Sequence, residues 1–386
     1  MHLDPLNDPS ITGPRAGRAF VLCAAALAAV GCQHLPKAAP APPVAGAVLS
    51  DELIAPGEEA HFEHLWQVTF GGQNAEAYWS FAGDRLSLQI TDPNKGFECD
   101  RIFVTGGGQD ALQQVSNGTG VTTCSYFLPG DERVLYASTH AGHSGCPQKP
   151  REEGYIWMVW PDYDIYSASL TDLDERPLVT GYGYDAEATV SPLGDRIVFT
   201  STRSGDLELW TCDLEGGDLF QVTNTLGYDG GAFFSHDGKR LVFRATQWTP
   251  GAEAAEQEKY RDLLSRWMVR PQSMEIYTIG ADGKDRQQVT TLGGANFAPY
   301  FYPDDQRIIF ATNHHAGGAG MNFDLFSIKT DGTGLERITT FDGPIGKQFD
   351  GFPMFSPDGE WLAFSSNRGD GIPGDTNVFV AKWKKR

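Results

Sequence analysis

The sequence predicts an all-β fold, a six-bladed β-propeller closed by pairing of its N- and C-terminal strands. Three observations predict it. A short phrase recurs six times, most clearly as FSPDGEWLAF at residues 355–364. Further strand-like segments follow each copy. A spare segment of the same kind precedes the first copy, while the last copy lacks one. Repeats of ~40–45 residues plus insertions, with four strands each, are typical of propeller blades.

Each copy of the phrase is expected to form a β-hairpin. A first strand ends in an aromatic or aliphatic residue, a Pro/Asp/Gly turn follows, and a second strand comes after the turn. Asp and Gly tolerate the positive backbone angles that a tight hairpin requires. The residues that end the first strands are Trp79, Phe127, Val190, Phe234, Phe301 and Phe355.

The third strand of each repeat is marked by an aliphatic-aromatic pair, and the fourth by a Val-Thr-like pair that usually follows a turn. Ile102-Phe103 and Val115-Ser116 show both pairs in the first repeat. The sixth repeat ends soon after Val378-Phe379, whereas a spare Gln67-Val68-Thr69 stands before the first hairpin. The termini are therefore expected to meet in one blade, which removes the free edges of an open ring.

The Ser-Pro-Asp-Gly phrase and the Ser-x-Arg sequences at 201–203 and 366–368 resemble the TolB-type family of six-bladed propellers with WD40-like (PD40) repeats. The resemblance covers about Leu65 to Trp383 and implies a periplasmic binding scaffold. These motifs encode turns and blade packing, so they are specific for fold and weak for function. TolB carries an α/β domain before its propeller, and here a short tail precedes Leu65. Its partners, TolA and the peptidoglycan-associated lipoprotein, are therefore not carried over.

The N-terminus predicts export. Arg15 and Arg18 precede an apolar run at 19–30 that is too short to span a bilayer. Cys32 follows Ala-Val-Gly and resembles a lipobox cysteine, and Gln33 after it favours the outer membrane. We expect a lipoprotein signal at 1–31, a Pro/Ala-rich tether at 32–60, and the propeller at 61–386. Plain secretion to the periplasm with Cys32 unmodified is the alternative.

Composition limits the partners. The formal net charge of −20 disfavours binding to nucleic acid. We expect a monomer whose partner is an envelope protein or a glycan. Four cysteines remain after the signal and Cys32, and they allow three pairings. They are Cys99, Cys124, Cys146 and Cys212. We expect Cys124 to pair with Cys146, because both fall in loops of the second blade.

A small polar side chain stands five residues before each hairpin anchor, where the chain enters the channel. The six are Asn74, Thr122, Asp185, Asp229, Asn296 and Asp350. Such residues cap tight turns without any ligand. Alternatively, the three aspartates with Glu76 and Glu187 form an electronegative mouth that holds Ca²⁺ or orients a cationic partner. On this second interpretation Asn296 also belongs to the binding surface.

A second, chemically mixed ring lies four residues past each hairpin. It consists of Asp92, His140, Arg203, Gln247, His314 and Arg368. Arg203 and Arg368 either join the binding surface or brace Asp206 and Asp370. His140 and His314, with the adjacent His315 and with Gln247, are candidate ligands of a transition metal.

Two functions remain open. The first is an envelope lipoprotein whose acidic channel mouth binds a partner, alone or beside a hydrolase on another chain. The second is a metal-dependent hydrolase or polysaccharide lyase with His140 and His314 at the site and Glu187 as base. The standard catalytic and nucleotide-binding motifs are absent from the sequence, which favours the first. The insertion at 249–271 has apolar residues at helical spacing and predicts an amphipathic helix.

Overall fold

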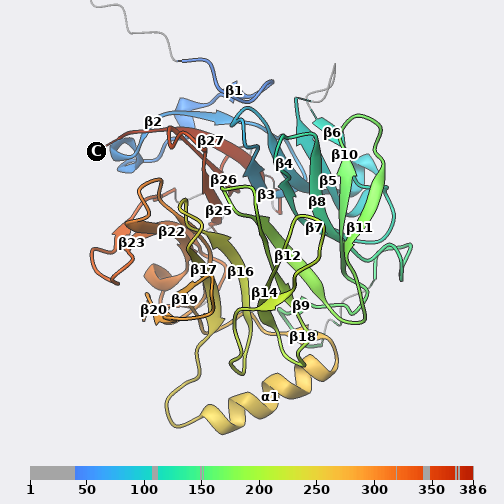
Figure 1. Ribbon diagram of the computed structural model, residues 1–386. Helices are drawn as coiled ribbons and strands as arrows, with labels where there is room; N and C mark the ends of the chain where they lie inside the picture. The colour runs from blue at the N-terminus through green and yellow to red at the C-terminus, as the bar shows by residue number, and fades with distance from the viewer. Residues whose placement is uncertain are drawn as a thin grey trace, which may run out of the picture. The chain divides into compact units, whose positions relative to one another are not determined.

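Each repeat forms one antiparallel sheet, and the six sheets are the blades of a ring (Figure 1). The computed structural model describes residues 40–106, 112–147, 150, 152–318, 320–341, 348–369, 372 and 374–385. The chain from Ala41 to Arg386 is a single unit. The predicted signal and Cys32 lie outside the described residues, as does most of the tether before Pro40. The six-bladed propeller predicted from the sequence is confirmed.

The first three blades follow the chain in order. Blade 1 contains β3 (Gln73–Trp79), β4 (Leu86–Asp92), β5 (Phe97–Thr105) and β6 (Leu112–Gln114). Blade 2 contains β7 (Thr122–Phe127), β8 (Arg133–Ser138), β10 (Asp164–Ser169) and β11 (Glu175–Val179). Blade 3 contains β12 (Asp185–Val190), β13 (Ile197–Ser201), β14 (Glu208–Cys212) and β15 (Phe220–Gln221). Every first strand ends at its predicted anchor residue.

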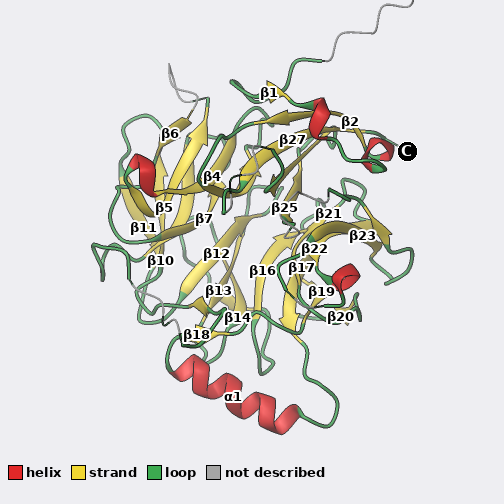
Figure 2. Ribbon diagram, turned by 180° about the vertical axis from the view of Figure 1, so that it is seen from behind, coloured by secondary structure: helices red, strands yellow, loops and turns green. Residues whose placement is uncertain are grey.

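The remaining blades repeat the pattern (Figure 2). Blade 4 contains β16 (Asp229–Phe234), β17 (Arg240–Thr246), β19 (Met274–Gly280) and β20 (Gln287–Gln288). Blade 5 contains β21 (Asn296–Phe301), β22 (Arg307–Thr312), β23 (Asp324–Lys329) and β24 (Glu336–Arg337). Blade 6 contains β25 (Asp350–Phe355), β26 (Trp361–Ser366) and β27 (Asn377–Trp383).

Blade 6 is completed from the other end of the chain. β2 (Phe62–Gln67) pairs antiparallel with β27, placing Leu65 opposite Ala381 and Trp66 opposite Val380. The short β1 (Val48–Leu49) then adds to β2. The closure predicted from the spare segment is confirmed, and it places the η2 turn (Glu58–Ala60) against the sixth blade.

The repeated polar residues of the sequence bind the backbone. The hydroxyl of the Val-Thr signature accepts a hydrogen bond from the amide of the third strand, as Thr223 does from Leu209 at 2.9 Å and Thr339 does from Leu325 at 2.9 Å. In the hairpin turn, Ser356 Oγ donates to Asp358 at 2.5 Å and accepts from Trp361 N at 3.0 Å. These bonds explain why the pattern predicts the fold without predicting a ligand.

Two insertions meet at the edge of the ring. β9 (Trp157–Met158) comes from the loop after β8, and β18 (Met268–Val269) follows α1 (Glu253–Ser265), the helix that the sequence predicted. β9 and β18 pair with each other, and α1 lies beside them at the rim (Figure 1). Within the described residues no helix is long and apolar enough to cross a bilayer.

Candidate functional site

The first strand of every blade carries a β-bulge at its third or fourth residue, where the pairing register shifts. At each bulge one residue has a positive φ between 48° and 61°, a left-handed conformation that is uncommon for residues other than glycine. The six residues are Glu76, Cys124, Glu187, Gly231, Ala298 and Phe352. Bulges redirect a side chain and occur beside functional sites.

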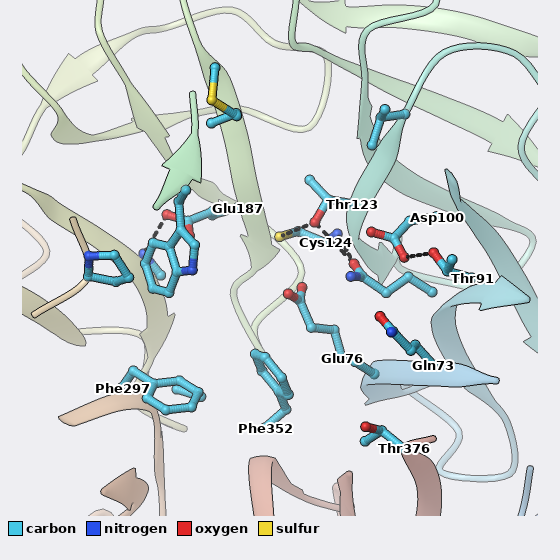
Figure 3. A pocket seen from close by; sticks show the side chains of 18 of the residues that line it. Gln73, Glu76, Thr91, Asp100, Thr123, Cys124, Glu187, Phe297, Phe352 and Thr376 are labelled. Carbon is cyan, nitrogen blue, oxygen red and sulfur yellow. Dashed lines mark hydrogen bonds between the residues drawn. The ribbon is translucent and has the colours of Figure 1, made fainter. Parts of the chain in front are cut away.

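All six bulge residues line a cavity of about 790 Å³. The loops that join the second and third strands and the residues that lead into the first strands contribute to its wall, so the cavity lies at the mouth where the first strands begin. Figure 3 shows Glu76, Cys124, Glu187 and Phe352 projecting into it from different blades. Its volume falls within the ~300–1,000 Å³ of typical ligand pockets.

One side of the cavity is aromatic. Phe297, Phe323, Phe349 and Phe352 of blades 5 and 6 contact one another with ring centroids 5.0–6.4 Å apart. The adjoining side is mostly polar and comes from blade 1, which neighbours blade 6; Gln73, Gln89, Thr91 and Asp100 reach the lining there. A wall of each kind suits a ligand that has an apolar part and a polar part.

Glu187 is held by donors on every side. Its Oε2 accepts from Tyr228 Oη at 2.5 Å, from Thr200 Oγ1 at 2.7 Å and from Gly231 N at 3.0 Å. Its Oε1 pairs with Arg244, whose guanidinium lies 4.8 Å from the Trp157 ring centroid. These contacts leave Oε2 with three donors and no free lone pair to take up a proton. Glu187 is therefore poorly placed as the general base that the sequence suggested.

Glycine is required beside this ion pair. A Cβ atom on Gly231 would lie 2.1 Å from Arg244 Nη1, and one on Gly230 would lie 2.6 Å from Glu187 Oε2. The two glycines of β16 therefore let Arg244 cross the backbone to reach Glu187.

Glu76 has a different environment. Burial raises its pKa from 4.5 to about 7, the Glu187 charge adds to this rise, and a hydrogen bond from Cys124 opposes it. Burial also raises the pKa of the Cys124 thiol, so the thiol stays protonated and donates. Glu76 Oε2 has no hydrogen-bond partner among the described residues. A buried polar atom without a partner calls for a physical explanation.

The paired insertions form a cover over part of the cavity, which we define as residues 152–160 and 266–271. Trp157, Met158 and Pro271 of the cover line the cavity. Two arginines hold its halves together, since Arg266 lies 2.6 Å and Arg270 lies 3.5 Å from Glu153.

The disulfide differs from the predicted one. Cys99 of β5 is bonded to Cys146, while Cys124 and Cys212 are free. The predicted Cys124–Cys146 pair is wrong because the loop after β8 crosses to the neighbouring blade, whereas Cys124 sits on the bulge of β7. Cys99 and Cys146 both line the cavity, so the disulfide anchors the loop that leads into the cover.

The ring of small polar residues is buried and internally paired. Arg203 binds both carboxylate oxygens of Asp185 at 2.9 Å, and Arg286 binds Asp229. Arg368 binds Asp350 at 2.9 Å and also Glu58. The three aspartates therefore do not form the open acidic mouth that the second interpretation predicted.

The other members of this ring also bond within the protein. Asn296 Nδ2 donates to Met274 O at 2.8 Å, Asn74 Nδ2 donates to Gly71 O at 2.9 Å, and Thr122 Oγ1 donates to Asp100 O at 2.8 Å. The expected bracing of Asp206 by Arg203 is likewise wrong, because Arg203 turns to Asp185. Asp370 lies outside the described residues.

The candidate metal ligands do not converge. His140 contacts Ser138 at 2.8 Å and Glu175 at 3.0 Å, whereas His314 bonds Leu292 O at 2.8 Å. His315 pairs with Asp324 at 3.0 Å, and Gln247 accepts from Tyr277 Oη at 2.9 Å. None of these four lines the cavity, and no group of three or more metal-binding side chains occurs in the described part of the chain. The predicted ligand set is therefore not assembled.

Sequence reasoning found Glu76 and Glu187 but missed Cys124, Arg244, Phe297 and Phe352. The signal was present in the alignment of the six copies. The position two residues after the polar ring holds five different residue types in the six blades, in the order Glu, Cys, Glu, Gly, Ala and Phe. Variation at a structurally equivalent position is what a ring of non-identical blades needs to build an asymmetric site.

The comparisons with known proteins agree with the ring. No family model matches the sequence. A TolB homolog from Chlorobium luteolum is 28% identical over 166 residues, covering 38% of this chain and 37% of that protein. The structure of a putative TolB from Agrobacterium tumefaciens superposes with a TM-score of 0.51 at 15% identity, covering 83% of this chain and 93% of that one. The chain is a TolB-like six-bladed β-propeller.

This likeness concerns the fold. The chain matches about a third of the length of the Chlorobium luteolum protein and of a second TolB homolog from Chlorobium chlorochromatii, which is 25% identical over 141 residues. A gluconolactonase from Xanthomonas campestris has a similar TM-score of 0.52 at 14% identity, covering 88% of this chain and 94% of that one. Since TolB-like and enzymatic propellers share this architecture, function has to be argued from the site.

Proposed function

We propose that this TolB-like propeller is a noncatalytic binding scaffold of the bacterial cell envelope, which takes part of a protein or glycan partner into its central cavity. The observation that carries the proposal is the 790 Å³ cavity at one mouth of the ring, with its aromatic and polar walls. The binding surface expected at the aspartate ring is thus moved inward to the bulge residues. The histidine-based enzyme has no comparable support, because its ligands are dispersed.

The proposed location is the periplasm, with the chain lipid-anchored through Cys32 at the outer membrane. The basic and apolar N-terminal sequence, the lipobox-like Cys32 and Gln33 support it. Replacing Cys32 with serine should move the protein from the membrane pellet to the soluble periplasmic fraction. A wild-type protein that is already soluble and lacks an acyl mass on Cys32 would contradict the anchor.

Site-specific photo-crosslinking in living cells tests the binding face. Tyr155 and Met321 line the cavity and are 54% and 45% exposed, so a benzophenone side chain fits at either position. We expect both positions to give the same discrete adduct, either a protein band or a glycan smear that lysozyme removes. The two positions should give the same adduct because a partner that occupies the cavity contacts both of them.

Leu193 provides the matched control. It is 61% exposed in the turn between β12 and β13, at the opposite end of the first strand from the bulge. Crosslinking from Leu193 should not yield that adduct. The same adduct from all three positions, or none from Tyr155 and Met321, would refute the assignment of this face.

A further inference from the structure

The lining of the cavity is strongly unbalanced in charge. Five acidic residues reach it, namely Glu76, Glu98, Asp100, Glu187 and Asp375. Arg244 is the single basic side chain among the described lining residues, and it is already paired with Glu187. Glu187 is paired with Arg244 and Asp100 accepts from Thr91, but the lining as a whole keeps an excess of negative charge. Low-dielectric walls strengthen the field of this excess charge, so the cavity favours a positively charged group.

Glu76 supplies a specific contact point. Its carboxylate is directed into the cavity (Figure 3), and its Oε2 is buried and has no hydrogen-bond partner among the described residues. The other carboxylate oxygen is already occupied, because the Cys124 thiol donates a hydrogen bond to this carboxylate. One available oxygen suits the point charge of an ammonium, whereas a guanidinium makes its best contact with both oxygens at once.

Aromatic rings lie beside this carboxylate. Phe352 projects into the cavity next to Glu76, and Phe297 faces it from the next blade (Figure 3). The Phe297 and Phe352 ring centroids are 5.7 Å apart with an interplanar angle of 68°. Aromatic faces attract cations and also bury an aliphatic stem.

The geometry points to the lysine side chain of a partner protein, a primary ammonium on an aliphatic stem, as the group bound in the cavity. This inference rests on the proposed function. The ammonium donates to Glu76 Oε2, and the stem lies along Phe297 and Phe352. A neutral glycan would leave the charge imbalance of the lining uncompensated, so it is the less favoured occupant.

Binding should be linked to the protonation of Glu76. The charged or titratable groups that act on Glu76 are Cys124 of β7, Glu187 of β12, Arg244 of β17 and Asp100 of β5. Cys124 stays a thiol, Arg244 and Glu187 neutralise each other, and Asp100 accepts from Thr91. With a pKa of about 7, Glu76 is roughly 90% ionised at pH 8 and roughly 10% ionised at pH 6. The affinity for an ammonium should therefore rise about tenfold from pH 6 to pH 8.

Methionine-methyl NMR of the full chain can test this, because Met158, Met274 and Met321 line the cavity. Met354 of blade 6, which accepts a hydrogen bond from Trp79 N of blade 1 and does not line the cavity, is an internal reference. The probe is an acetylated, amidated alanine pentapeptide with a central lysine. We expect saturable shifts of the three cavity methyls at pH 8 and about tenfold weaker binding at pH 6.

Three variants separate the contribution of the Glu76 carboxylate from that of the other lining charges and from that of the aromatic rings. Glu76→Gln should weaken binding at pH 8 at least tenfold and abolish its pH dependence, because a charged hydrogen bond is lost. Glu98→Gln, which removes an exposed charge from the same lining, should change the affinity less than twofold. Phe352→Leu, which keeps the carboxylate, should weaken binding several-fold. An unperturbed Met354 methyl signal shows that each variant is folded.

The remaining outcomes decide against the inference. Equal binding of a pentapeptide with norleucine in place of lysine would overturn it, and so would binding that Glu76→Gln leaves unchanged. Equal affinity for n-butylamine would show that a free amine, and not a protein side chain, is the ligand. Shifts caused by chitotetraose but not by the lysine peptide would leave the scaffold proposal standing with a glycan partner. Absence of the crosslinks from Tyr155 and Met321 would instead refute the scaffold proposal itself.

Discussion

Replacing Arg368 with methionine is expected to lower the free energy of unfolding by about 3–5 kcal/mol. The Arg368 side chain is 0% exposed and binds Glu58 and Asp350, whose side chains are also 0% exposed. Methionine can fill much of the volume but donates no hydrogen bond, so two buried carboxylates would be left without their cation. Urea unfolding at pH 7 measures the effect.

Arg203 offers the matched control for this prediction. It holds Asp185 in the equivalent position of blade 3, but it is 21% exposed and has one carboxylate partner. Arg203→Met should therefore cost less than Arg368→Met. Equal losses for the two variants, or a loss below about 1 kcal/mol for Arg368→Met, would contradict the view that Arg368 binds the N-terminal segment to blade 6.

Removing the disulfide by Cys99→Ser together with Cys146→Ser is expected to lower stability by about 2–4 kcal/mol. The bond closes a loop with a sequence separation of 47 residues, so its loss increases the conformational entropy of the unfolded chain. It should also loosen the loop that leads into the cover, which acrylamide quenching of Trp157 and Trp160 would report as greater access.

Cys212→Ala is the control, because Cys212 is buried and free. It should leave acrylamide quenching unchanged. Peptide mapping of the unreduced protein adds a direct test, since it should recover Cys99 linked to Cys146. A peptide that joins Cys124 to Cys146 would restore the pairing that the sequence suggested and remove the physical basis of the stability prediction.

The sequence predicted the fold well because its determinants are local. The hairpin turn at Ser356 and Asp358 and the Val-Thr hydroxyls bond within a few residues or to the adjacent strand. A pattern that repeats every blade therefore reports the sheet directly. The helix at 253–265 followed from apolar spacing in the same way, with Tyr260 and Leu263 as its buried residues.

The site could not be derived in the same way because its contacts are distant in sequence. Asp229 meets Arg286 at a separation of 57 residues, and Arg368 meets Glu58 at 310. An aspartate that is paired and one that is free look alike in a repeat alignment. The predicted disulfide pairing was wrong for a related reason, because the path of the loop from blade 2 to blade 1 is set by tertiary packing and has no local sequence signature.

A crystal structure of the protein soaked at pH 8 with the lysine pentapeptide tests most directly whether the bulge residues, and not the aspartate ring, form the binding site. The account predicts the ammonium within hydrogen-bonding distance of Glu76 Oε2, its stem against Phe297 and Phe352, and the arginine pairs of Asp185, Asp229 and Asp350 intact. Peptide bound at those aspartates, with Glu76 uncontacted, would contradict it.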